Sequence, residues 1–127
     1  MELRSFSHVT LDVIGMRFHH TYEIVAEPPN AVLTRYVHHY ENGEAVKKPE
    51  KTVTCSMDEL LQLLQSCKIA AWDGFHGAHP KDVKDGDMFS LVAVINDDQT
   101  IQAEGSANYP EGYLDLVREM DRILSER

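Results

Sequence analysis

Histidine is the enriched residue type in this chain that could do chemistry. The sequence has seven histidines, at His8, His19, His20, His38, His39, His76 and His79. A neutral imidazole is a common ligand of zinc and related ions, which makes metal binding the first chemistry to consider. Adjacent residues of a strand point to opposite faces, so neither His19–His20 nor His38–His39 can chelate one ion as a pair. Chelation therefore needs one histidine from each strand, and His20 and His38 would share a face if these strands are neighbours.

A second group of candidate ligands lies in the irregular stretch that follows the first predicted helix. His76 and His79 are separated by two residues, and four aspartates lie close by in sequence, at Asp73, Asp82, Asp85 and Asp87. Their spacing matches neither a zinc template nor a calcium loop. Solvated residues that make turns are the alternative interpretation. The sequence thus assigns no metal ligand, no cofactor-binding residue and no catalytic residue, and the 73–87 loop stays an alternative metal or small-ligand site.

The chain has no G-x-S-x-G motif, and its two cysteines are candidate nucleophiles. Cys55 precedes a predicted helix, where the helix N-terminus can lower a thiol pKa. Cys67 ends the apolar face of that helix, where a buried and unreactive thiol is expected. The helix between them would separate the two residues by roughly 17 Å, too far for a disulfide. We expect two reduced thiols.

The charge balance argues against two classes of partner. Lys and Arg total 12 against 21 Asp and Glu, which gives a net charge of -9. An acidic surface repels phosphate backbones and anionic lipid headgroups. The N-terminus lacks the apolar segment of a signal peptide, and no run approaches the roughly 20 apolar residues that span a bilayer. We predict one cytoplasmic domain over residues 1–127, with no nucleic-acid or membrane partner.

The elements that must position these side chains are strands in the first half of the chain. Alternating residues predict strands at 9–13, 17–26, 32–41 and 44–54. Gly15 is either a turn between the first two or a bulge within one longer strand. Asn42-Gly43 predicts a type I′ turn that pairs Glu41 with Glu44. Counting outward places Arg35 opposite Glu50, and the lysines and Pro49 of the return strand mark it as an edge.

Helices enter in the second half. Ser56 and Glu59 form a capping box for a helix that ends near Lys68. Strands follow at 88–95 and 100–105, and Pro110 is expected to open the last helix with Tyr109 as its N-cap. The fold class is α+β, an antiparallel sheet of about five strands with two helices on one face. The order is β-β-β-β-α-β-β-α, or the same with the first two strands merged.

Three short motifs also point to a family. They are AWDGF at 71–75, DGDMFSL at 85–91 and GSANYP at 105–110. In order and spacing they resemble an uncharacterised family of small bacterial proteins, hypothetical proteins of Gram-positive anaerobes. The first half departs from that pattern in being richer in histidine. The resemblance implies the same fold and no activity, cofactor or catalytic residue.

The rings of the early strands suggest where binding could occur. Two sets alternate along the chain, Phe18, His20 and Tyr22 in one strand and Tyr36, His38 and Tyr40 in the next. If the two faces coincide, they form a band suited to recognition or dimerisation, and if helices cover that face, the rings are core. Trp72 is expected to fill the core beneath the following loop, with ligand stacking as the alternative.

Two classes of function follow from these patterns. The first is a non-enzymatic binding or protein-interaction module that forms a homodimer through the sheet face. The second is a metal- or small-ligand-binding protein, enzymatic in one version, that uses the histidines and the 73–87 loop.

The interaction hypothesis makes a direct prediction. Tyr36→Glu or His38→Glu places a charge in the interface, so either change should dissociate an oligomer without unfolding the chain. Native mass spectrometry and far-UV circular dichroism measure the two effects. If both variants keep the parent's mass in solution, this surface is not the interface.

Overall fold

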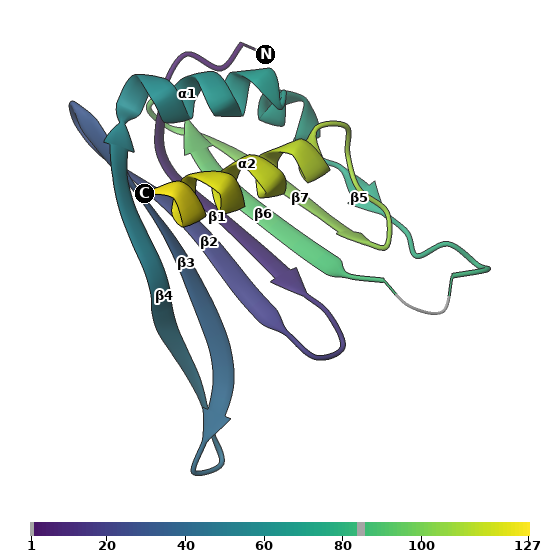
Figure 1. Ribbon diagram of the computed structural model, residues 1–127. Coiled ribbons are helices and arrows are strands. Elements are labelled where there is room, and N and C mark those ends of the chain that lie inside the picture. The colour runs from purple at the N-terminus through teal and green to yellow at the C-terminus, as the bar shows by residue number, and fades with distance from the viewer. Residues whose placement is uncertain (1, 84–85) are drawn as a thin grey trace.

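The computed structural model describes residues 2–83 and 86–127, in which one sheet is covered by two helices (Figure 1). The elements are β1 (Phe6–Ile14), β2 (His19–Glu27), β3 (Asn30–Glu41), β4 (Glu44–Ser56), α1 (Met57–Ser66), a 3-10 turn (Ile69–Trp72), β5 (His76–Gly77), β6 (Met88–Ile95), β7 (Gln99–Ser106) and α2 (Tyr113–Glu126). The strand order is β4-β3-β2-β1-β6-β7-β5. None of the described helices has the length and apolar character to cross a membrane.

The α+β class is confirmed, but two details of the predicted sheet are wrong. Over the described residues, the sheet has 7 strands instead of about five. The short β5 adds a parallel pairing with β7, at His76 with Glu104, to an otherwise antiparallel sheet. A strand of two residues is too short to show a period-2 pattern in the sequence, so its pairing with β7 could not be predicted. Gly15 lies in the turn between β1 and β2, whose ends pair Ile14 with His19.

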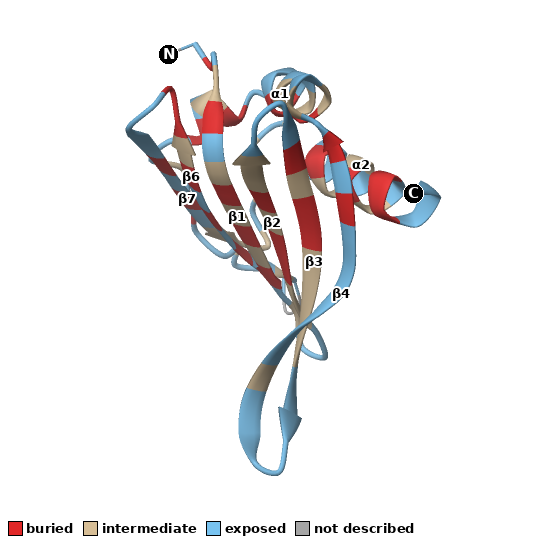
Figure 2. Cartoon of the chain, turned by 90° about the vertical axis from the view of Figure 1, so that its left-hand side faces the viewer, coloured by how far each residue is buried: buried red, intermediate tan, exposed pale blue. Residues whose placement is uncertain are grey.

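One face of the sheet carries the hydrophobic core. On β1, Val9, Leu11 and Val13 are buried, and the residues between them are intermediate. β2 and β3 follow the same alternation (Figure 2), except at Thr21 and Thr34, which are buried on the other face. Both helices pack on the buried side (Figure 1), with Leu60, Leu64, Leu116 and Met120 turned into the core. The other side, called the open sheet face here, carries the alternate residues of each strand.

The β3–β4 hairpin confirms the turn and corrects its register. Asn42 and Gly43 have φ of 51° and 82°, as a type I′ turn requires, and Glu41 pairs with Glu44. A register shift between Arg35 and Tyr36 places Arg35 opposite Lys51 instead of Glu50. The ion pair forms nevertheless, because Arg35 Nε reaches Glu50 Oε1 at 2.6 Å. Beyond the sheet, this hairpin extends as an exposed arm (Figure 2).

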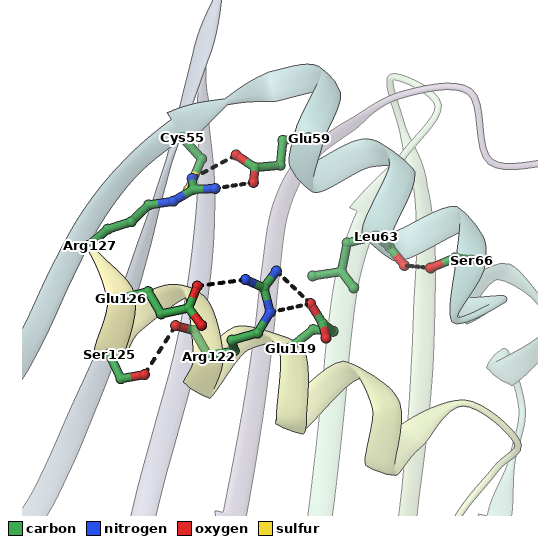
Figure 3. A network of polar contacts seen from close by, with 9 residues as sticks. All are labelled: Cys55, Glu59, Leu63, Ser66, Glu119, Arg122, Ser125, Glu126 and Arg127. Atoms are coloured by element: carbon green, nitrogen blue, oxygen red, sulfur yellow. Dashed lines mark hydrogen bonds and ion pairs between the residues drawn. The ribbon is translucent and has the colours of Figure 1, made fainter.

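The two helices are clamped together by charge at the chain end. Ser56 caps α1 as predicted, accepting from the Glu59 amide at 3.1 Å. The Glu59 carboxylate does not complete the capping box. It pairs with both terminal nitrogens of Arg127, which lies just past α2 (Figure 3). This hydrogen-bonded pair lowers the pKa of Glu59. A clasp between α1 and the end of α2 results.

The start of α2 differs from the prediction. Gly112, with φ of 92°, is the N-cap, so the helix begins at Tyr113 and neither Tyr109 nor Pro110 caps or opens it. The reason is a close approach. A Cβ on residue 112 would meet the Cys67 carbonyl oxygen at 2.2 Å, so only glycine fits. The chain therefore turns past α1 before it can become helical.

Both cysteines are buried, free thiols, as expected. Burial is the largest cause that raises the pKa of Cys55, with Glu59 adding to it, and burial also raises the pKa of Cys67. A raised pKa disfavours the thiolate that nucleophilic catalysis needs. The hypothesis that the helix N-terminus activates Cys55 therefore has no support in this environment.

Trp72 is buried in the core, where the sequence predicted it. Its ring lies 6.2 Å from the Tyr113 ring, and its Nε1 donates to the Glu111 carbonyl at 2.8 Å. The indole thus joins the segment after α1 to the start of α2.

Trp72→Ala should lower the free energy of unfolding by about 3–5 kcal/mol, because it leaves a cavity and removes this hydrogen bond. Urea unfolding followed by far-UV circular dichroism measures the loss. Trp72→Phe, which keeps most of the packing, is the control and should cost clearly less. An unchanged midpoint for Trp72→Ala would show that the indole does not hold the core.

Candidate metal centre

The open sheet face has an unusual set of charges. Three carboxylates of its strands pair with histidines, at distances of 3.4 Å for His8–Glu23, 3.1 Å for His19–Asp12 and 2.9 Å for His76–Glu104. Histidine and carboxylate side chains are common metal ligands, and a histidine–carboxylate pair is an ion pair only when the histidine is protonated. The geometry around each pair decides whether it can bind a metal ion.

One of these pairs belongs to a four-residue cluster that crosses three strands. Asp12 of β1 is opposite Thr21 of β2, and the register of β2 on β3 brings His19 beside His38. The two imidazoles stack with their centroids 3.6 Å apart and their planes 5° from parallel. The Thr21 hydroxyl donates to Asp12 Oδ1 at 2.5 Å and lies 2.7 Å from His38 Nε2. The hydroxyl therefore links the carboxylate to the second imidazole.

Three members of the cluster offer ligand atoms close enough for one ion. One nitrogen each of His19 and His38 and a carboxylate oxygen of Asp12 lie within 4.8 Å of one another. Among the residues that the structure describes, no other His, Cys, Asp and Glu side chains form such a group of three. The side chains of Asp12 and His19 are 36% and 33% exposed, so an ion from solvent can reach them.

Thr21 has a different role from the three ligand candidates. It is only 2% exposed, at the base of the cluster between Asp12 and His38. A buried hydroxyl cannot approach a substrate as a nucleophile. Its hydrogen bond instead orients Asp12, as groups behind a metal ligand commonly do.

The surroundings of His38 favour its neutral form, which has a free lone pair. Loss of hydration is the largest cause that lowers its pKa below the usual 6.5, and the nearby His19 and Lys47 add to this effect. Asp12 opposes it but does not reverse it. A neutral imidazole at pH 7 is the form that binds a metal.

The predicted pairing of His20 with His38 is wrong, although their strands are neighbours. His20 is opposite Val37, so the two side chains lie on opposite faces of the sheet. The prediction that the rings of the two strands form one band is wrong for the same reason. His20 and Tyr22 line a hollow beside α2, on the helix side, while the alternation places Tyr36 and His38 on the open sheet face.

The histidines of the 73–87 loop do not converge. His76 Nδ1 is 2.9 Å from Glu104 Oε1, and His79 Nδ1 is 2.9 Å from the Ser106 hydroxyl. Asp73 accepts from the Gln102 amide at 3.1 Å, which holds the loop against β7. Asp85 lies outside the described residues. The described part of this loop therefore does not bring its ligand candidates together.

Sequence reasoning missed Asp12, His19 and Thr21 as members of one site. The position of the turn at Gly15 is the information that would have brought these residues together. With Ile14 paired with His19, counting back along the hairpin places Asp12 opposite Thr21 on one face. The sequence alone does not decide whether Gly15 is a turn or a bulge, so it does not fix which residues of the two strands are opposite each other.

No family model, curated protein or solved structure matches this chain. The resemblance to an uncharacterised bacterial family stays a prediction, because nothing among these comparisons tests it. The function of the chain is therefore inferred from its own side chains.

The environment of His38 makes a testable prediction about pH. In a ¹H NMR titration, its midpoint should lie below the value of about 6.5 for a free histidine side chain. The unfolded chain then takes up this proton first as pH falls. The His38 contribution therefore lowers folding stability as pH falls below about 6.5, toward its folded pKa. A midpoint above 6.5 would show that Asp12 outweighs the loss of hydration.

Proposed function

We propose that this protein is a non-enzymatic binding module that holds one divalent transition-metal ion at Asp12, His19 and His38. The observation that carries the proposal is the convergence of these three ligand atoms within 4.8 Å, from three adjacent strands. Neighbouring strands of a packed sheet make a rigid frame, so the backbone positions that carry the ligands are fixed before an ion arrives.

The donor set indicates which ions would bind. Two imidazole nitrogens and one carboxylate oxygen suit zinc, and the same set also suits Fe(II). Calcium and magnesium prefer oxygen ligands and are disfavoured. Because three protein ligands leave at least one coordination position for solvent or another molecule, the ion would face the water above the open sheet.

Binding an ion requires a small rearrangement of the rings. Ligand atoms about 2.0–2.1 Å from a tetrahedral zinc lie about 3.3 Å apart, closer than the outer limit of 4.8 Å found here. Rotation of the half-exposed imidazoles can supply that change. The Thr21 hydroxyl can keep its bond to Asp12 while His38 turns towards the ion.

Isothermal titration calorimetry with zinc chloride tests the proposal. We expect one ion per chain, and we expect His19→Ala, His38→Ala and Asp12→Asn each to weaken binding at least about tenfold, the effect typical even of groups that only support a ligand. His20→Ala and His39→Ala are matched controls, because each removes the adjacent histidine of the same strand on the opposite face. These two should bind zinc like the parent.

Two results would contradict the proposal. One is no binding of zinc or Fe(II) by the parent chain, and the other is an equal loss in the triad and control variants. Affinity should also fall as pH is lowered below about 6.5, toward the depressed pKa of His38, because protons then compete with the ion for the His38 imidazole.

Self-association through the open sheet face is the second candidate function. It is supported by three exposed apolar side chains on that face, Ile14, Val92 and Met88.

A further inference from the structure

A partly apolar hollow lies on the open sheet face beside the proposed ion. It has a volume of about 350 Å³ and runs between β1, β6 and the segment that contains β5. Ile14 and Met88 are its exposed apolar members, at 37% and 48% exposure. Ser90, Ser106, His76 and Glu104 place polar groups around it, and the Glu104 carboxylate is paired with His76.

The strand register makes this hollow continuous with the Asp12–His19–His38 cluster. Ile14 is opposite His19 on one side and opposite Met88 on the other, and Asp12 is opposite Ser90. Directly opposed side chains of neighbouring strands touch. The row from His19 through Ile14 to Met88 spans two strand spacings, about 10 Å. A ligand on the ion would therefore extend over Ile14 and Met88 without crossing a gap.

The charge at the ion indicates which chemical group would face it. A divalent cation with one carboxylate ligand keeps a net positive charge, and Lys47, opposite His38 on β4, adds another. An anionic oxygen donor fits this field. The Ile14 and Met88 side chains beside it offer apolar surface and no charge, so the same ligand would carry an apolar tail.

We infer that the ion and the hollow form one composite site for an oxygen chelator with an apolar tail, such as a carboxylate or hydroxamate. This inference rests on the proposed metal binding. The head group takes the coordination positions that Asp12, His19 and His38 leave open. The tail lies against Ile14 and Met88, and the polar rim at Ser90 and Ser106 hydrogen-bonds to water or to a polar end of the ligand.

The test compares two hydroxamates with the zinc-loaded protein by isothermal titration calorimetry. Acetohydroxamate has the same head group as octanohydroxamate and almost no tail. We expect octanohydroxamate to bind at least about tenfold more tightly, since each buried methylene contributes about threefold to fourfold. In Met88→Ser this advantage should fall below about threefold, with acetohydroxamate binding unchanged.

Val92→Ser is the matched control. Val92 is an exposed apolar residue of β6 on the same face, but it lines a different hollow. It should keep the full advantage of the longer ligand. Equal affinities for the two hydroxamates on a chain that holds zinc would overturn the inference and leave the metal proposal standing. A parent chain that holds neither zinc nor Fe(II) would overturn both.

Discussion

Helices cover one face of the sheet, and side chains alternate between its two faces. This constraint determines which residues form the core and which lie on the open sheet face. Val9, Leu11 and Val13 supply the core beneath the helices, so the residues between them must face away. Asp12 is therefore held on the open sheet face by the burial of its two neighbours. A slip of one residue would bury the carboxylate and expose the core, and this cost keeps the register in place.

The same constraint gathers the candidate ligands. His19 and His38 are far apart in sequence, yet the pairing of β2 with β3 places their rings 3.6 Å apart. Thr21, buried between them and Asp12, ties the three strands together at that level. A site built in this way depends on the sheet as a whole and on no loop, which suits a stable binding function better than one that needs a moving segment.

Polar contacts on the covered side support this frame at its edges. Asp121 of α2 accepts from Tyr22 of β2 at 2.7 Å and from Arg35 of β3 at 2.8 Å. Arg127 joins the end of α2 to Glu59 of α1 (Figure 3). Because α2 is anchored to the two strands that carry His19 and His38, its packing and the geometry of the open sheet face are linked.

Local chemistry was enough to predict several elements from the sequence alone. Asn42-Gly43 specified its turn because few residue pairs accept two positive φ values, and Ser56 specified the start of α1 because an orphan amide needs an acceptor. The start of α2, the parallel β5 and the faces of His19 and His20 were decided by tertiary structure. The close approach of the Cys67 carbonyl requires glycine at position 112 and so delays the start of α2. The pairing of strands distant in sequence determines which side chains meet. The sequence determined which residues could act as ligands, and only the register of three strands decided which of them share a face.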